Sequence, residues 1–292
     1  MNLKNKSEKL NIAFFGTPQF AVTILDELKK AGIMPRLIVT APDAPQGRGL
    51  VLTAPPVKIW AQENGVKILQ SNSLKNTAEI APILNQAWDL FIVAAYGKII
   101  PANILEIPKH KTLNVHPSLL PKWRGPSPIE SAILNDERET GVTIIRLDAE
   151  MDHGPIVAQE KISNATWPIT SPILENILAH AGGKLLAKII PDWTTGKIAE
   201  KPQDHSRATY CQKITKADGL INLSENPYQN YLKICAYTGW PGSYFFVEHA
   251  SKKIRVSIKN ASYKDGVLEI LRVIPEGKKE ILYSDFLRGL KK

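Results

Sequence analysis

Short apolar runs recur along the first two thirds of the chain, and segments with helical spacing separate them. The first run, Asn11 to Phe15, precedes a helical pattern over Thr17 to Gly32, and a second apolar run follows at Arg36 to Thr40. Thr17 and Pro18 offer an N-cap and a first-turn proline for the helix. The order strand, helix, strand predicts a parallel sheet of the α/β class.

The same pattern continues toward the middle of the chain. Asp89 to Ala95 is nearly all apolar, which is typical of a strand covered by helices on both faces, although a buried helix segment is the competing interpretation. Further strands are predicted at Leu113 to His116 and Gly141 to Leu147, and a helix with an apolar stripe runs from Ser171 to near Ile190. These elements predict an open-sheet α/β domain over residues 10–191.

The last third of the chain has a different pattern. Residues 192–207 are polar and rich in turn formers, which indicates a linker. Beyond it, short β-prone runs separated by turn residues predict a small β-barrel in residues 208–292. These runs are Ser243 to Val247, Lys253 to Ile258, Gly266 to Val273 and Lys279 to Tyr283.

Positive charge is concentrated in this second predicted domain. The 292-residue chain has a formal net charge of +9, and the part from Arg207 onward holds 15 Lys and Arg against 8 Asp and Glu. A basic domain is expected of a protein that contacts phosphate backbones, but solubility alone also leaves small domains positive. Charge therefore leaves both interpretations open.

The cysteines and the N-terminal segment bear on the compartment. Cys211 and Cys235 form no C-x-x-C pair, so they are interpreted as structural thiols in a reducing compartment. The segment from Met1 to Leu10 is polar, and no apolar run after it is long enough for a signal core or a membrane span. We expect a cytoplasmic protein with no membrane partner.

Candidate chemistry stands at the end of one predicted strand. The chain has no phosphate-binding G-x-x-x-x-G-K-[ST], dinucleotide G-x-G-x-x-G, serine-hydrolase G-x-S-x-G or zinc-protease H-E-x-x-H motif. In Asn114-Val115-His116-Pro117, the first and third side chains share a face of the strand. An amide that donates to an oxyanion beside an imidazole that moves a proton suits acyl transfer. Hydrogen bonds within a turn are the alternative.

Three segments further along provide the context for this pair. They are Ser118-Leu119-Leu120-Pro121-Lys122-Trp123-Arg124-Gly125, Gly141-Val142-Thr143 and Met151-Asp152-His153-Gly154-Pro155. With these segments the chain resembles the folate-dependent formyltransferase family from about Leu10 to the C-terminus. The resemblance implies a Rossmann-like open-sheet formyltransferase domain, followed by a small OB-like β-barrel domain.

The resemblance also implies a reaction and three catalytic residues. Asn114 and His116 match the family's catalytic amide and imidazole, and Asp152 matches its catalytic carboxylate. An Asx-turn before Gly154 is the other explanation for Asp152. The implied reaction moves the formyl group of 10-formyltetrahydrofolate to an amine, with no covalent enzyme intermediate and no metal.

By the same resemblance, two segments are expected to bind the folate. One is the loop after the catalytic pair, and the other is a strand end whose backbone meets the pteridine ring. The residues are Ser118, Leu119, Leu120 and Pro121 in the loop, with Tyr96 and Gly97 at the strand end. Both segments follow predicted strands, and open α/β sheets bind ligands at the carboxyl ends of their strands.

The acceptor amine is expected from features outside the catalytic residues. The loop from Thr40 to Leu50 resembles an insertion that tRNA-formylating members place near the acceptor arm, and Arg48 is the residue carried over. A solvated loop is the alternative. Trp240, in the basic domain, is interpreted as a core anchor rather than a base-stacking platform.

We therefore expect a monomeric enzyme that formylates initiator methionyl-tRNA for translation initiation. A sugar or nucleotide N-formyltransferase that uses the same folate donor is the alternative enzyme, and an RNA-binding module without catalysis is the alternative from another class. The chain departs from the family's usual residues at a few loop positions, namely Trp123, Pro126, Ser127 and His153.

Overall fold

The computed structural model describes residues 10–47, 49–163, 166–249 and 252–290, which form two compact units. Of these residues, the first unit contains 10–124, 141–161 and 176–208, and the second contains 125–140, 162–175 and 209–290. Two segments from the first two thirds of the chain thus join the C-terminal part. The functional boundaries expected from the sequence, 10–191, 192–207 and 208–292, remain a prediction.

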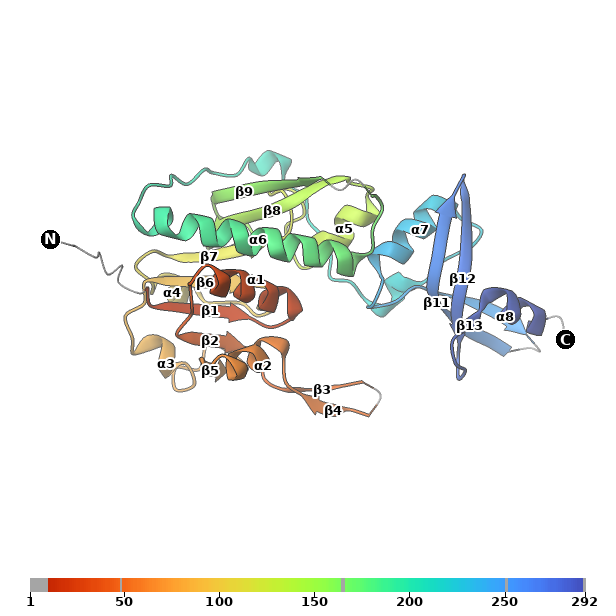
Figure 1. The fold of residues 1–292 in the computed structure, drawn as a ribbon, viewed down its shortest axis with the longest axis horizontal. Coiled ribbons are helices and arrows are strands. Elements are labelled where there is room, and N and C mark those ends of the chain that lie inside the picture. Colours follow the sequence, from red (N-terminus) through yellow and green to blue (C-terminus); the bar gives the residue numbers. More distant parts are fainter. Residues whose placement is uncertain (1–9, 48, 164–165, 250–251, 291–292) are drawn as a thin grey trace. The chain divides into compact units, whose positions relative to one another are not determined.

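A mostly parallel sheet forms the centre of the first unit (Figure 1). The strands pair in parallel from one edge as far as β7, and β8 then pairs antiparallel to β7. In spatial order the seven strands are β5 (Lys67–Gln70), β2 (Leu37–Thr40), β1 (Ile12–Gly16), β6 (Leu90–Ala94), β7 (Thr112–His116), β8 (Glu139–Arg146) and β9 (Ile156–Ser163). The predicted α/β class with an open sheet is confirmed.

Burial explains why the central strands are nearly all apolar. Every residue of β1, β6 and β7 is buried, as expected for strands covered on both faces. On one side of the sheet, the Phe15 ring lies 5.2 Å from the Phe91 ring and 5.6 Å from the Tyr96 ring, centroid to centroid. Aromatic pairs at this separation add to the stabilisation from burial itself.

Helices cover this sheet, and the longest runs beyond its predicted end. They are α1 (Gln19–Lys30), α2 (Pro56–Glu63), α3 (Ala81–Leu84), α4 (Ala102–Leu105) and α6 (Ser171–Thr194). In α6, a Cβ atom on Gly182 would lie 2.6 Å from Val115 of β7, and one on Gly183 would lie 2.7 Å from the Cβ of Glu27 in α1. These glycines let α6 pack closely against the sheet and α1.

The predicted cap of α1 is wrong. Pro18 is the N-cap residue, the helix begins at Gln19, and no side chain caps it. The Thr17 hydroxyl instead donates to the backbone carbonyl of Tyr96 at 3.0 Å. A carbonyl at the end of a neighbouring strand competes with the helix for this donor, and no local sequence pattern indicates that competition.

The segment predicted as a loop after β2 contains a short hairpin. Strands β3 (Ala44–Gln46) and β4 (Val51–Thr53) pair antiparallel, and Leu50 and Val51 are 72% and 67% exposed. Figure 1 shows the hairpin projecting beyond α2 and the strands of the first unit. Arg48 falls between these two strands but lies outside the described residues.

The second unit contains a four-stranded antiparallel sheet, consistent with the predicted small OB-like barrel. The strands are β10 (Tyr244–His249), β11 (Lys252–Lys264), β12 (Val267–Pro275) and β13 (Ile281–Leu282), and the helices are α5 (Pro128–Leu134), α7 (Pro227–Ala236) and α8 (Tyr283–Leu290). A register shift between Ile258 and Asn260 interrupts the β11–β12 ladder, and such bulges bend a strand as barrel closure requires. Helix α8 was not predicted. Trp240, which was interpreted as a core anchor, is 56% exposed, so that interpretation is wrong.

Both cysteines are buried free thiols in this unit. The Cys211 sulfur accepts a hydrogen bond from the backbone N–H of Ser127 at 3.2 Å. Burial raises the pKa of the Cys235 thiol to about 11. Cys235 therefore stays protonated at neutral pH and packs as a small apolar residue.

Candidate active site

Asn114 and His116 lie in the carboxyl-terminal half of β7, and every residue of this strand is buried. Asn114 is 8% exposed and His116 is 4% exposed. Asn114 pairs with Val93 of β6 and Ile145 of β8, so its backbone is held on both sides. Within the part of the chain that the structure describes, the Asn114 side-chain amide has no hydrogen-bond partner. Its NH2 group is thus available to a ligand.

His116 contacts a polar group through each ring nitrogen. Its Nε2 lies 2.9 Å from the backbone carbonyl oxygen of Trp123, and a carbonyl only accepts, so Nε2 carries a proton in this contact. Its Nδ1 faces Oδ1 of Asp152 at 3.5 Å. This second separation is longer than a good hydrogen bond. Nδ1 is therefore the ring nitrogen that faces the Asp152 carboxylate.

Asp152 stands in a tight turn with left-handed backbone conformation. Its φ is +50°, which costs an Asp residue roughly 1 kcal/mol, and its side chain is 13% exposed. Two residues later, a Cβ atom on Gly154 would overlap the carbonyl oxygen of Arg146, so only glycine fits there. This turn lies between β8 and β9, and it brings the Asp152 carboxylate close to His116 of β7.

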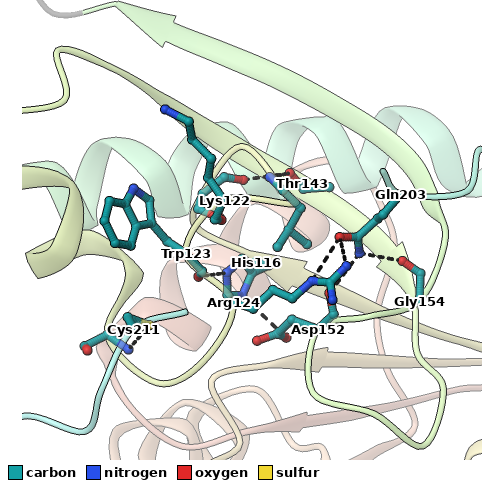
Figure 2. Close-up of polar contacts among 12 residues, drawn as sticks. His116, Lys122, Trp123, Arg124, Thr143, Asp152, Gly154, Gln203 and Cys211 are labelled. Atoms are coloured by element: carbon teal, nitrogen blue, oxygen red, sulfur yellow. Dashed lines mark hydrogen bonds and ion pairs between the residues drawn. The ribbon is translucent and has the colours of Figure 1, made fainter. Parts of the chain in front are cut away.

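A buried glutamine and a buried arginine hold this turn (Figure 2). The Gln203 side-chain amide donates to the backbone carbonyls of Asp152, at 2.8 Å, and Gly154, at 2.7 Å. Its carbonyl oxygen accepts from Nε of Arg124 at 3.2 Å and from Nη2 at 2.7 Å. Arg124 also contacts Nδ1 of His205 through Nη2 at 2.8 Å. Neither Arg124, Gln203 nor His205 was predicted as a site residue.

His153, which departs from the family's usual residue, belongs to the same cluster. Its ring stacks on the His205 ring at a centroid distance of 4.1 Å, with an angle of 4° between the planes. Its Nδ1 contacts Oδ2 of Asp148 at 2.8 Å. The departure is therefore accommodated by packing beside the Asp152 turn rather than by contact with His116.

The predicted folate loop is shaped by the hydroxyl of Thr143. This hydroxyl donates to the carbonyl of Ser118 at 2.6 Å and accepts from the backbone N–H of Leu120 at 3.1 Å. The Gln159 amide adds hydrogen bonds to Thr143 and to the Leu120 carbonyl. Ser118 and Leu120 are buried, whereas Leu119 and Pro121 are partly exposed. The loop is thus fixed before any ligand binds.

The other predicted folate segment follows β6. Ala95 and Gly97 both have positive φ, +46° and +77°, and both are exposed. The Tyr96 ring between them packs into the core cluster, so only the backbone of this segment is open to a ligand. Burial raises the pKa of Tyr96 to about 12, which keeps its hydroxyl protonated.

The structure thus places the predicted residues at one edge of the sheet, with one exception. Asn114 and His116 lie in β7, the 118–121 loop follows β7, and the 95–97 turn follows β6. The Asp152 carboxylate lies 3.5 Å from His116. Arg48 is the exception, since it lies outside the described residues. Sequence reasoning assigned no role to Thr143, although a threonine between Val142 and Ile144 in β8 is a usable signal.

No other feature of the described residues competes with this site. Among them, no group of three or more His, Cys, Asp or Glu side chains could hold a metal ion. A cavity of about 520 Å³ lies elsewhere, in the second unit, where Trp167 and three tyrosines line it, but it includes none of the predicted catalytic residues. None of the helices described is both long and apolar enough to cross a membrane.

Comparisons with known proteins agree with the fold. A family model described as formyl transferase matches residues 10–190. A methionyl-tRNA formyltransferase of Campylobacter curvus is 41% identical over 270 residues, which cover 92% of this chain and 86% of that protein. A methionyl-tRNA formyltransferase of Halalkalibacterium halodurans is 36% identical, and the match covers 96% of this chain and 95% of that protein.

Solved structures share the fold at lower sequence identity. The crystal structure of a 4-N formyltransferase from Francisella tularensis has a TM-score of 0.64 at 20% identity, and the match covers 87% of this chain and 99% of that chain. The chain belongs to the formyl transferase family, a family of enzymes. The resemblance stated from its motifs is confirmed.

The buried Tyr96 hydroxyl generates a prediction about stability. Within the described residues this hydroxyl has no hydrogen-bond partner, and a buried unpaired hydroxyl costs about 1–3 kcal/mol. We expect Tyr96→Phe to raise the free energy of unfolding by about 1 kcal/mol in urea titrations. Tyr228→Phe is the matched control, because its hydroxyl donates to Asp136 at 2.7 Å and its removal should destabilise. A loss of stability in Tyr96→Phe would show that the hydroxyl has a partner.

Proposed function

We propose that this protein transfers the formyl group of 10-formyltetrahydrofolate to the amino group of initiator methionyl-tRNA, for translation initiation. The observation that carries the proposal is the approach of Asp152 to His116 beside the unpartnered amide of Asn114. These are a donor, a proton carrier and a carboxylate, which formyl transfer to an amine requires. The family membership supports the same reaction.

Asn114 is proposed to stabilise the oxyanion. When the acceptor amine attacks the formyl carbon, a C–N bond forms and the carbonyl oxygen gains negative charge. An amide NH2 has two hydrogens to donate to that oxygen and cannot act as a base. Because Asn114 has no competing partner among the described residues and is buried, its hydrogen bond forms away from water, where it is strong.

His116 and Asp152 are proposed to handle the protons. The attacking amine must lose a proton, and the folate nitrogen must gain one as its bond to the formyl carbon breaks. The Nε2–H of His116 is held by the Trp123 carbonyl, which leaves Nδ1, facing Asp152, for exchange. The Asp152 carboxylate, 13% exposed, accepts the proton or orients a water that carries it.

The 118–121 loop and the 95–97 turn are proposed to bind the folate. Leu119 and Pro121 offer partly exposed apolar surface, and the turn after β6 offers backbone groups between two exposed residues of positive φ. Flat heterocycles bind to apolar surface with a few backbone hydrogen bonds that fix their orientation. The loop follows β7, which carries Asn114, and the turn follows the adjacent strand β6. This placement suits a donor whose formyl group meets the Asn114 amide.

The acceptor is proposed from the second unit. The relatives named methionyl-tRNA formyltransferases match through this unit as well as the first. On the β10–β11 sheet, Arg255 lies 3.7 Å from the centroid of the Tyr244 ring, and Lys253 lies 4.5 Å from that of Phe246. Interleaved aromatic and cationic side chains are typical of RNA-binding faces. We assign catalysis to residues 10–191 and tRNA binding to 208–292.

The remaining expectations extend this proposal. We propose a cytoplasmic enzyme, which the two free thiols support because they are usual in reducing compartments. We also propose that it acts as a monomer, which gel filtration would test. A sugar or nucleotide amine is the second candidate acceptor, since the solved formyltransferase structures share the fold, but the basic aromatic face favours RNA.

The first prediction of this proposal concerns the acceptor. Purified protein should formylate charged initiator tRNA with 10-formyltetrahydrofolate and prefer it to free amino-sugar nucleotides, because only tRNA contacts the second unit. Competition between the two acceptors in one assay, read by the kcat/KM ratio, is the measurement. Preference for the sugar would establish the second candidate, and tRNA binding without any transfer would establish an RNA-binding module.

The catalytic pair generates a second prediction. Asn114→Asp keeps the size of the side chain but removes the NH2 donor, and loss of such a donor typically lowers kcat about 10²–10³-fold. His116→Ala should lower kcat comparably, with tRNA affinity unchanged, in steady-state formylation and filter-binding assays. His110→Ala, in the loop that enters β7 at its other end, is the matched control and should retain activity. Equal losses in kcat and tRNA affinity would contradict the assigned roles.

A third prediction concerns the RNA-binding face. Arg255→Ala should raise the KM for tRNA about tenfold, leave kcat unchanged and lower the slope of log affinity against log salt by about 1, because one phosphate contact is lost. Arg48→Ala should likewise impair use of the acceptor. The exposed Lys67→Ala of β5 serves as a charge-matched control. An unchanged KM in Arg255→Ala would remove this face from the tRNA-binding surface.

A further inference from the structure

We propose that Gln203 is a positioning residue for the reaction, which sets the Asp152 carboxylate against His116 by holding the backbone on which that carboxylate stands. The proposal rests on the proposed function, because it concerns the same His116 and Asp152. Gln203 touches neither His116 nor the place of the reacting atoms; it acts through the Asp152–Gly154 turn.

Every hydrogen-bonding group of the Gln203 side chain is used. Its two amide hydrogens go to the carbonyls of Asp152 and Gly154, and its oxygen accepts twice from the Arg124 guanidinium. A side-chain amide has two donors and two acceptor sites, so none is left over. At 4% exposure, no bulk water competes for these bonds. The orientation of the amide is thus fixed by its partners at both ends.

These contacts close a ring around the His116–Asp152 pair. From Nε2 of His116 the ring passes to the carbonyl of Trp123, and the next residue along the chain is Arg124. Arg124 binds Gln203, Gln203 binds the backbone of Asp152, and the Asp152 carboxylate faces Nδ1 of His116. Figure 2 shows the side chains of His116, Arg124, Gln203 and Asp152 close together. The 3.5 Å separation is therefore set by the ring as a whole.

The segment that carries Gln203 is itself anchored beside the turn. Lys201 and Ile156 exchange two backbone hydrogen bonds, of 2.8 and 2.9 Å, where β9 begins. Asp152 has a φ of +50°, a conformation that persists only when neighbouring groups hold it. The two hydrogen bonds from Gln203 go to the carbonyls of Asp152 and Gly154, the residues on either side of His153. They are placed to hold that conformation.

The chemistry of the side chain explains why an amide is needed. In Gln203→Glu the shape is kept and the carboxylate still accepts from Arg124, now as an ion pair. However, the two donors are lost, and one carboxylate oxygen would face the carbonyls of both Asp152 and Gly154, acceptor against acceptor. The substitution thus keeps an acceptor for the buried Arg124. It removes both hydrogen bonds to the turn and replaces them with electrostatic repulsion.

The experiment measures kcat and KM for Gln203→Glu in the folate and tRNA formylation assay. We expect kcat to fall about 100-fold, because a displacement of about 1 Å in a catalytic group costs that much, with both KM values within about twofold of wild type. Gln203→Ala, which lacks the repulsion, should fall less, about tenfold. Gln62→Glu, an exposed glutamine of α2 with the same change of charge, should match wild type.

A double-mutant cycle with Asp152→Asn separates positioning from general loosening. If Gln203 acts through the Asp152 carboxylate, Gln203→Glu should cost under about threefold in the Asp152→Asn background, since coupled sites are not additive. An equal cost in both backgrounds, or a rise in KM with unchanged kcat, would overturn the proposal. Thermal unfolding of each variant checks folding, and Gln203→Ala provides the cycle if Gln203→Glu does not fold. Failure of wild type to transfer would instead refute the proposed function.

Discussion

A polar side chain that is buried must replace the hydrogen bonds it made to water, and the carboxyl end of β7 buries several such side chains together. Arg124 is 2% exposed, His116 4% and Gln203 4%. An arginine cannot lose its proton to escape the cost of burial, so the chain around it must supply acceptors. Three separate loops, around residues 118–124, 152–154 and 201–205, meet this demand. The arrangement of His116 and Asp152 follows from the same set of hydrogen bonds.

In the proposed function, the reaction and the recognition of the acceptor depend on different parts of the chain. The Asn114, His116 and Asp152 set lies in the first unit, within the segment that the family model matches. The aromatic and cationic face formed by Tyr244 and Arg255 lies in the second unit. A family that keeps the catalytic set but changes the face that binds the acceptor can use one chemistry on several amines. Function resides in sites rather than in folds.

The strands and helices predicted correctly are those whose burial is evident from the pattern of apolar residues in the sequence. β1, β6 and β7 are apolar throughout because helices cover both faces of the sheet, and the short runs of the second unit are flanked by turn residues. β9 was missed because half of its residues are exposed and polar, and the β3–β4 hairpin because it is exposed and contains Pro45. Gln203 could not be found, since its role depends on partners 51 and 79 residues away.

The two cysteines have a consequence for how the molecule can be studied. Cys211 and Cys235 are the whole cysteine content of the chain, both are buried, and the Cys235 thiol stays protonated at neutral pH. Alkylating reagents attack thiolates that they can reach, so the native protein should resist them. A single cysteine introduced on the exposed β3–β4 hairpin would then be the one reactive thiol, and a fluorophore placed there would report on what approaches that hairpin.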